Sequence, residues 1–420
     1  ERRIPARARS LVRGIARSAP LAAVARLRTE RRRLRLCGPG GEELAEVDDD
    51  EVSVLVGRRV ASRFREIEVE LAEGADPAVL TEVVGALRRA GATASDPTPK
   101  VVRALGPAAV GPPDVVAPAG RRPATLGEAV TAAIAGSVAG LLAHDPGVRL
   151  GDDPEDVHKA RVATRRLRSD LRTLRSLLDD KWVQDLRDEL RWIAGLLGAV
   201  RDTDVLVERL ESHATGLTPE DRPGADKLIG RLRGEQEAAR LELLAGLDAP
   251  RYTDLLERLV IAAREPFIGP DVDPDHGPEG MAELVLRPWR HLAAAVDSLG
   301  SDARDGQPTD DALHEVRIRA KRCRYAAEAV AAIVGKPAAA FAATVADLQS
   351  VLGDFHDSVV AEAWLRDACG AEDAASPAEV FVAGQMVTME RQAAQAQRAE
   401  WPRVWKRAAA GKRRRWIPGA

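Results

Sequence analysis

Hydrophobic and polar positions divide the chain into two parts with different periods. From about residue 124 onward, apolar residues recur every three or four positions, as on one face of a helix, and strand-like alternation is absent. Clusters of Pro and Gly delimit predicted helices of about 15–25 residues, a length used in helical bundles. The clusters fall at 144–147, 152–154, 216–223, 266–278, 300–308 and 335–337. The sequence therefore predicts an all-helical region that extends to about residue 410.

Residues 1–104 have a mixed pattern. Several runs have strand character, and a Gly-Pro-Gly-Gly turn separates the first two as in a hairpin. A helical period, with Pro at its start and Gly after its end, follows at 77–91. Residues 105–123 are rich in Pro and Gly and predict a linker. The runs with strand character are 24–37, 42–47, 52–56 and 63–71.

The helical region contains an internal repeat. Two predicted helices each carry a histidine that is followed by basic residues at offsets 3, 7, 8 and 10. Downstream, the segment LGAVRD at 197–202 corresponds to LGDFHD at 352–357. The repeat copies span about 124–265 and 278–410. Their shared positions are His158, Arg161, Arg165, Arg166 and Arg168 in the first copy and His314, Arg317, Lys321, Arg322 and Arg324 in the second.

The basic residues of each repeated helix form a column. At about 100° per residue, the histidine and most of the cations share one arc, and the apolar positions lie elsewhere. Arg172 and Arg175 extend the first column, and Asp170 is the only acid between His158 and Arg175. Neighbouring like charges cost a few tenths of a kcal/mol per pair. A polyanion site explains this column better than the alternative, a solvated basic face, which would interleave acids.

The residue types in the column suit phosphate. Arginine binds phosphate oxygens through two parallel hydrogen bonds and keeps its charge. His158 and His314 add donors that become charged near pH 6.5, or they are helix caps or packing residues. Arg201 and His356 each precede an Asp that is a candidate cap for a following helix. Both residues are candidate members of the same site, or they are solvated.

Composition narrows the possible functions. The chain has 420 residues with 62 basic and 65 acidic side chains, so its net charge of -3 excludes a bulk polycation. The three cysteines are far apart, which excludes a disulfide framework and favours a reducing, cytoplasmic location. Aromatic residues make up 3% of the chain, too few for base-stacking platforms. The uncharged run 129–143 is too short and too weakly apolar to span a membrane.

The two histidine-led helices and the two Leu-Gly segments resemble the CHAD domain, a family named for conserved histidines on a helical fold. The resemblance covers about 124–410, and residues 411–420 follow it as a basic tail. It implies two pseudo-symmetric four-helix bundles whose basic helices face a common groove or pore. It also implies inorganic polyphosphate as the ligand and no cofactor. The expected fold class is α+β, mainly helical, with a small, partial antiparallel sheet and helices at the N-terminus.

The N-terminal part resembles the latter portion of a CYTH domain, the triphosphate tunnel fold. In a strand, Glu66 and Glu68 share one face, and a carboxylate row suits a divalent metal such as Mg²⁺ or Mn²⁺. The resemblance implies phosphate binding by Arg26 and Arg28. An exposed strand face is the alternative. The Glu-x-Glu-x-Lys strand that opens the family's fold is absent from this sequence.

These observations rank three functions. The leading expectation is the binding of inorganic polyphosphate by the basic helix faces, which fits association with polyphosphate granules. The alternative is a metal-dependent inorganic triphosphatase in which the CHAD-like part assists substrate binding or targeting. The missing strand leaves catalysis open, and no catalytic residue is assigned. Nucleic-acid binding fits less well, because aromatic residues are scarce and no groove-reading motif is present. The oligomeric state is left open.

Overall fold

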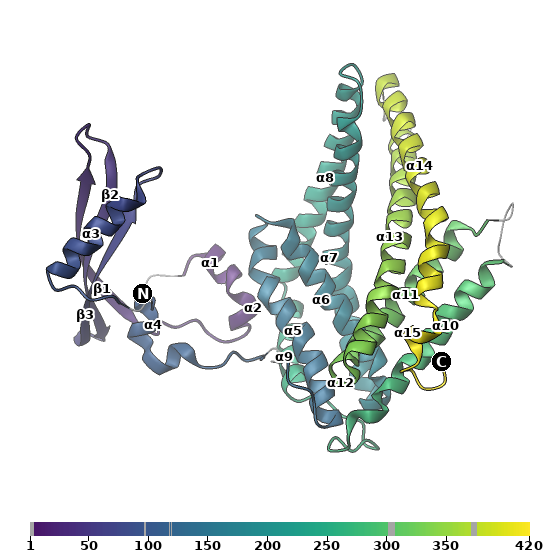
Figure 1. The fold of residues 1–420 in the computed structure, drawn as a ribbon, viewed down its shortest axis with the longest axis horizontal. Helices are drawn as coiled ribbons and strands as arrows, with labels where there is room; N and C mark the ends of the chain where they lie inside the picture. Colours follow the sequence, from purple (N-terminus) through teal and green to yellow (C-terminus); the bar gives the residue numbers. More distant parts are fainter. Residues whose placement is uncertain (1–3, 96–97, 117, 119, 301–306, 371–375) are drawn as a thin grey trace. The chain divides into compact units, whose positions relative to one another are not determined.

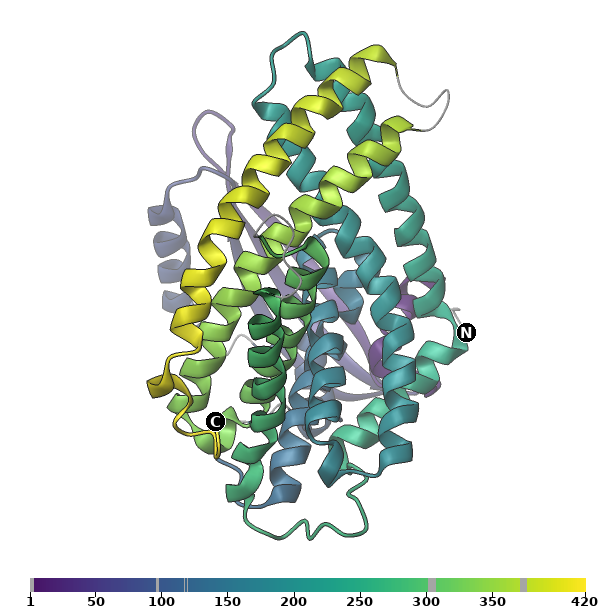
Figure 2. The ribbon, with the colours of Figure 1, turned by 90° about the vertical axis from the view of Figure 1, so that its right-hand side faces the viewer.

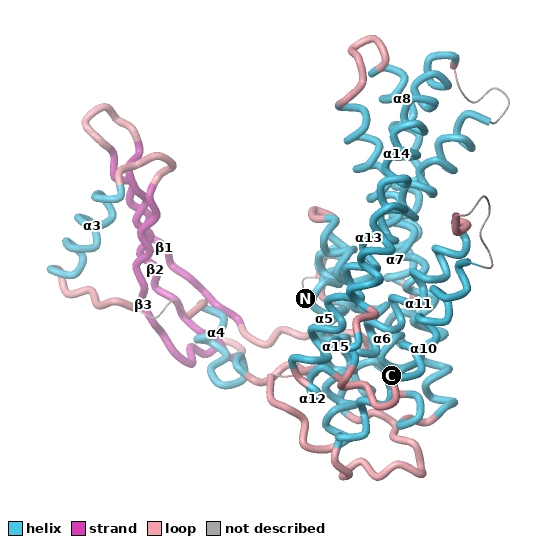
Figure 3. Tube along the Cα trace, turned by 45° about the vertical axis from the view of Figure 1, so that its right-hand side comes forward, coloured by secondary structure: helices cyan, strands magenta, loops and turns pink. Residues whose placement is uncertain are grey.

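The computed structural model describes residues 4–95, 98–116, 118, 120–300, 307–370 and 376–420, which fall into two compact units. Glu1–Ala19 and Asp114–Ala420 form a helical unit, and Pro20–Pro113 form a sheet unit. Figures 1 and 3 show that the labelled strands lie in the sheet unit. The expected fold class, α+β and mainly helical, is confirmed.

The sheet unit is built on three antiparallel strands in the order β1-β2-β3. One prediction was wrong here, because the runs 42–47 and 52–56 form a single strand. The acidic residues between these runs pair in the sheet with arginines of the neighbouring strands, such as Asp48 with Arg33 and Asp49 with Arg65. The elements of this unit are β1 (Arg26–Cys37), β2 (Glu43–Val56), β3 (Arg59–Leu71), α3 (Pro77–Arg89), α4 (Lys100–Leu105) and the 3-10 turn η1 (Gly106–Val110).

The helical unit contains two series of packed helices that follow the two copies of the repeat. In the first series α5, α6, α7 and α8 pack in sequence order, and in the second α10, α11, α13 and α14 do the same. Helices α6 and α11 pack against each other and join the two series. The elements are α1 (Ala6–Leu11), α2 (Arg13–Ala16), α5 (Leu126–Leu150), α6 (Pro154–Thr173), η2 (Arg175–Leu177), α7 (Asp180–Thr215), α8 (Arg222–Asp248), α9 (Pro250–Arg264), η3 (Pro278–Val285), α10 (Leu286–Asp297), η4 (Ser298–Gly300), α11 (Asp310–Ala329), α12 (Ala331–Val334), α13 (Lys336–Gly370), α14 (Pro377–Ala408) and α15 (Gly411–Arg414).

Several helices are longer than the predicted 15–25 residues. Helices α7, α13 and α14 have 36, 35 and 32 residues. Figures 1 and 2 show the α7–α8 and α13–α14 pairs extending beyond the shorter helices. Helix α5 also continues through the predicted break at 144–147. There, buried Asp145 accepts hydrogen bonds from Tyr252 and Arg149, so tertiary contacts stabilise a turn that Pro146 disfavours.

Helix α5 is long and apolar enough to cross a membrane by length and composition alone. Its residues Val130, Ile134 and Val138 are fully buried and belong to the common core of the helical unit. A core helix with this composition is explained by the packing of the unit itself.

Two boundaries differ from the prediction. Residues 1–104 were expected to form one domain, but α1 and α2 pack on α5 and α9 of the helical unit. Arg13 donates to Thr253, and Arg17 pairs with both Glu257 and Asp114. The expected linker at 105–123 is shorter, because η1 occupies its beginning and the helical unit resumes at Asp114.

The contact between α2 and α5 depends on a glycine. A Cβ added to Gly14 would lie 2.7 Å from Oδ2 of Asp145, which its own hydrogen bonds hold in place. Gly14→Val is therefore expected to detach α1 and α2 and to destabilise the protein by about 1–3 kcal/mol. Hydrogen–deuterium exchange of residues 6–16 and the melting temperature measure both effects. Gly230→Val, at a position with open space, is the matched control, and equal exchange in the two variants would contradict this account.

Candidate functional site

The repeated helices α6 and α11 bury their apolar faces as the repeat predicts. Leu167 and Leu171 of α6 and Cys323 and Ala327 of α11 are fully buried in the common core. Asp170 is also buried and accepts a hydrogen bond from Ser137 of α5 (Ser137 Oγ to Oδ2, 3.0 Å). Burial raises the pKa of Asp170 to about 7. The only acid between His158 and Arg175 is thus engaged in the core.

The two Leu-Gly segments lie inside helices and support arginines of the repeat. The side chain of Arg161 lies against Gly198 of α7, and that of Arg317 lies against Gly353 of α13. In both copies a Cβ on the glycine would be 3.8 Å from the arginine Nε. The prediction that an Asp caps a new helix here was wrong, because α7 and α13 continue through these segments.

The aspartates of these segments pair with the same arginines instead. Asp202 lies 2.9 Å from Nη2 of Arg161, and Asp357 lies 3.9 Å from Nη2 of Arg317. The two copies of the repeat therefore build equivalent arginine–glycine–aspartate contacts between neighbouring helices.

The histidines of the repeat lie among the charged residues of these helices. Asp153 and Thr309 cap α6 and α11, so His158 and His314 are not the N-caps. Nδ1 of His314 lies 3.1 Å from Nδ1 of His356. Partial burial, together with Arg317 and His314, lowers the pKa of His356 to about 4.

Arg201 acts on the histidine of the first copy. Partial burial lowers the pKa of His158, and the positive charge of Arg201 lowers it further. His356 thus lies beside His314 in the second copy of the repeat, and in the first copy the charge of Arg201 acts on His158.

A small pocket lies between α6 and α11. Its volume is about 210 Å³. Nε of Arg165 donates to the hydroxyl of Tyr325 (2.6 Å) and links the two helices. Partial burial and the nearby Arg317 lower the pKa of Lys321 to about 7. The pocket is lined by Arg165, Arg168, Ser169, Arg172, Ile318, Lys321, Arg322 and Tyr325.

Most cations of the two helices form a continuous group that we call the cation row. They lie on the facing sides of α6 and α11, and several have no carboxylate partner in the described part of the chain. Nε of Arg168 and Nε of Arg317 are buried without a hydrogen-bond partner among these residues. The cation row consists of Arg161, Arg165, Arg168 and Arg172 of α6 and Arg317, Lys321 and Arg322 of α11.

Two predicted site residues outside the cation row also have a carboxylate partner. Nε of Arg324 donates to Glu328 (2.7 Å), and Nη2 of Arg166 lies 4.0 Å from the same carboxylate. Glu328 lies beyond the repeated motif, so the motif alone did not indicate this neutralisation. The charges of Arg166 and Arg324 are therefore partly compensated within the protein.

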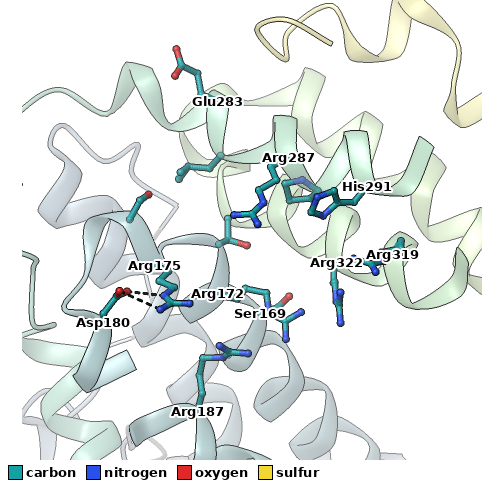
Figure 4. Close-up of a pocket in the computed structure, with 14 residues that line it drawn as sticks. Ser169, Arg172, Arg175, Asp180, Arg187, Glu283, Arg287, His291, Arg319 and Arg322 are labelled. Carbon is teal, nitrogen blue, oxygen red and sulfur yellow. Dashed lines mark hydrogen bonds and ion pairs between the residues drawn. The ribbon is translucent and has the colours of Figure 1, made fainter. Parts of the chain in front are cut away.

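A larger pocket of about 860 Å³ adjoins the row at Arg172 and Arg322 (Figure 4). It includes basic residues that the sequence analysis missed, namely Arg187 of α7 and Arg287 and His291 of α10. These residues lie outside the repeated motif, and only the packing of α7 and α10 beside α6 and α11 brings them here. A sequence pattern that indicates them is not apparent.

Comparison with known proteins identifies the family of the helical unit. The family model for the CHAD domain matches residues 132–366. This chain belongs to the CHAD family. Two Mycobacterium tuberculosis proteins, uncharacterized protein MT2285 (strain CDC 1551 / Oshkosh) and uncharacterized protein Rv2226 (strain ATCC 25618 / H37Rv), are each 32% identical to it over 379 residues. The match covers 85% of this chain and 70% of each relative.

Solved structures share the CHAD fold. PptA from Streptomyces chartreusis is 23% identical, with a TM-score of 0.55, and the match covers 67% of this chain and 99% of PptA. The CHAD domain from the plant Ricinus communis is 25% identical, with a TM-score of 0.50, and the match covers 68% of this chain and 94% of that domain. The resemblance of residues 124–410 to the CHAD domain is thus confirmed over most of its length.

The sheet unit lies outside the residues that match the CHAD model, and its resemblance to a CYTH domain stays a prediction. Nζ of Lys100 lies 2.9 Å from Glu66 and 3.3 Å from Glu68. Lys100 also contacts Asp50, whose pKa is lowered to about 2, chiefly by a hydrogen bond from Arg31. The described residues contain no group of three or more His, Cys, Asp or Glu that could hold a metal. The cations of the unit itself are therefore the partners of this carboxylate row.

The predicted phosphate and metal residues of the sheet unit lie on opposite faces. Glu66 is in register with Asp50 of β2, whereas Arg28 is in register with Ser53. Because side chains alternate between the faces of a strand, Arg26 and Arg28 face away from Glu66 and Glu68. The structure does not bring these four residues together in one site.

Proposed function

We propose that this CHAD protein binds inorganic polyphosphate along the cation row. The observation that supports the proposal is the pocket between α6 and α11, where five cations from two helices converge and no carboxylate lines the wall. Held close together, these side chains repel one another, and this repulsion adds to partial burial in lowering the pKa values of Arg172 and Lys321. A bound polyanion would replace this repulsion by attraction.

The length of the row suits a linear polymer. Arg161 and Arg172 are eleven residues apart on one helix, which corresponds to about 16 Å along its axis. Arginines offer paired donors to phosphate oxygens along this path. The ligand has no bases, so recognition depends on charge and spacing, and the binding proposed here needs no cofactor.

A salt titration tests the proposal. If about six phosphates are neutralised, the affinity for long-chain polyphosphate should fall about 20-fold between 100 and 200 mM salt, as it does for single-stranded nucleic acids with that number of contacts. Isothermal titration calorimetry at a series of salt concentrations gives the slope. An affinity that is absent or independent of salt would contradict electrostatic capture by the cation row. Single-stranded DNA at equal phosphate concentration is the competitor that separates this function from nucleic-acid binding.

A further inference from the structure

The larger pocket, here called the end pocket, differs in volume from the pocket between α6 and α11. Its volume of about 860 Å³ is about four times the 210 Å³ of the pocket between α6 and α11. Volumes of this order are typical of sites for whole small molecules. A single phosphate chain that fits the smaller pocket would leave most of the end pocket empty.

The end pocket carries uncompensated positive charge. Arg172, Arg187, Arg287 and Arg322 line it, and within the described chain none of them has a hydrogen-bond or ion-pair partner. Nε of Arg187 is buried with no partner among those residues. Partial burial, followed by the charges of Arg322 and Arg187, lowers the pKa of Arg172 to about 10. The pocket thus holds four arginines whose hydrogen-bonding capacity is unused.

The acidic residues at the pocket do not cancel this charge. Asp180 accepts two hydrogen bonds from Arg175, at 2.7 and 3.2 Å, and these two residues compensate each other. Figure 4 shows Glu283 pointing away from the arginines. Arg319 is paired with Glu315 on its own helix. The uncompensated cations are therefore Arg172, Arg187, Arg287 and Arg322.

The four arginines surround the space instead of following one helix. They come from α6, α7, α10 and α11, and Figure 4 shows their side chains around a common opening. His291 of α10 and the hydroxyl groups of Ser169, Thr173 and Ser176 supply further donors. Donors on several sides fit phosphate groups that project in several directions from one centre.

We propose that the end pocket binds a compact small molecule that carries several phosphate monoesters on one ring. Each phosphate would accept paired hydrogen bonds from an arginine, which is the geometry that the guanidinium group favours. This site is additional to the cation row, and the inference does not require that the row binds polyphosphate. Because the end pocket and the row share Arg172 and Arg322, a ligand in the pocket would compete with the end of a chain in the row.

The test uses myo-inositol hexakisphosphate as the probe and calorimetry on the full chain at 150 mM salt. The double variant Arg187→Ala/Arg287→Ala removes cations of the end pocket that are absent from the row. It is expected to weaken binding of the probe at least about 30-fold, since hydrogen bonds to charged groups are lost at two positions. The variant Arg161→Ala/Arg317→Ala alters only the cation row and should change the affinity for the probe less than threefold. Arg251→Ala/Arg391→Ala, at exposed pairs elsewhere, is the charge-matched control.

The outcomes separate this inference from the proposed function. Failure of the wild-type protein to bind the probe, or equal losses in the pocket and row variants, would overturn the end pocket as a separate site. Long-chain polyphosphate is titrated in parallel, and its binding with no binding of the probe would leave the proposed function standing. Circular dichroism melts verify that each variant is folded. Arg187→Lys/Arg287→Lys, which keeps the charges but not the paired donors, should bind the probe with intermediate affinity.

Discussion

A variant that lacks four cations of the cation row is expected to bind long-chain polyphosphate about 1,000-fold more weakly than the wild-type protein. Each lost charge-assisted contact removes about 1 kcal/mol after allowance for screening and non-additivity, and about 4 kcal/mol corresponds to this factor. The affinity is measured by calorimetry at constant salt. The substitutions are Arg161→Ala, Arg165→Ala, Arg317→Ala and Lys321→Ala.

The control removes the same number of charges from other helix surfaces. Its four arginines are exposed and paired with carboxylates outside the row, so their loss should change the affinity only a fewfold. Undiminished binding by the row variant, or an equal loss in the control variant, would mean that overall charge and not the row holds the polymer. The control substitutions are Arg233→Ala, Arg251→Ala, Arg366→Ala and Arg391→Ala.

Affinity for polyphosphate is also expected to fall by up to about 100-fold between pH 7 and pH 9. In the free protein the pKa of Lys321 is about 7 because of partial burial and the charges of Arg317, Arg165 and Arg161, while Asp357 acts in the opposite direction. A bound polyanion raises the pKa of this lysine, so above pH 7 binding takes up one proton. Because binding is coupled to the uptake of this proton, the affinity falls by up to about tenfold for each unit by which the pH rises.

The pH profile has an internal control. Below about pH 7 Lys321 is protonated in both states, so its contribution to the slope disappears. The pKa of each of His158, His314 and His356 is lowered, so these residues are neutral in the free protein above pH 7. Lys321→Arg keeps the charge at all these pH values and should flatten the profile. A wild-type profile that equals that of the arginine variant would show that Lys321 does not titrate in the complex.

The cation row could be predicted because it follows from the period of one helix. Arg161, Arg165, Arg317 and Lys321 lie three and seven residues after a histidine, and helical geometry alone places such residues on one face. The arginines of the end pocket could not be predicted in this way. Arg187 belongs to α7, and its position beside α6 depends on how the helices pack.

The Leu-Gly segments show why a correct motif was given the wrong structure. Glycine inside a helix costs up to about 1 kcal/mol relative to alanine, so Gly198 and Gly353 indicated helix ends. Each instead provides a flat surface against which the side chain of Arg161 or Arg317 lies. The local signal was outweighed by a contact between helices that are separate in the sequence. Similarly, the acidic run of β2 became a strand because arginines of neighbouring strands pair with it.

The contacts of α1 and α2 determine how the two units are connected. The sheet unit is inserted between α2 and α5, and both ends of the insertion belong to the helical unit. Arg17 and Asp114, which flank the insertion, form an ion pair at 2.5 Å. The chain therefore leaves and re-enters the helical unit at nearly the same point. Pro20–Pro113 can be regarded as a cassette, whose replacement by a short linker would keep all the helices of the polyphosphate-binding unit proposed here.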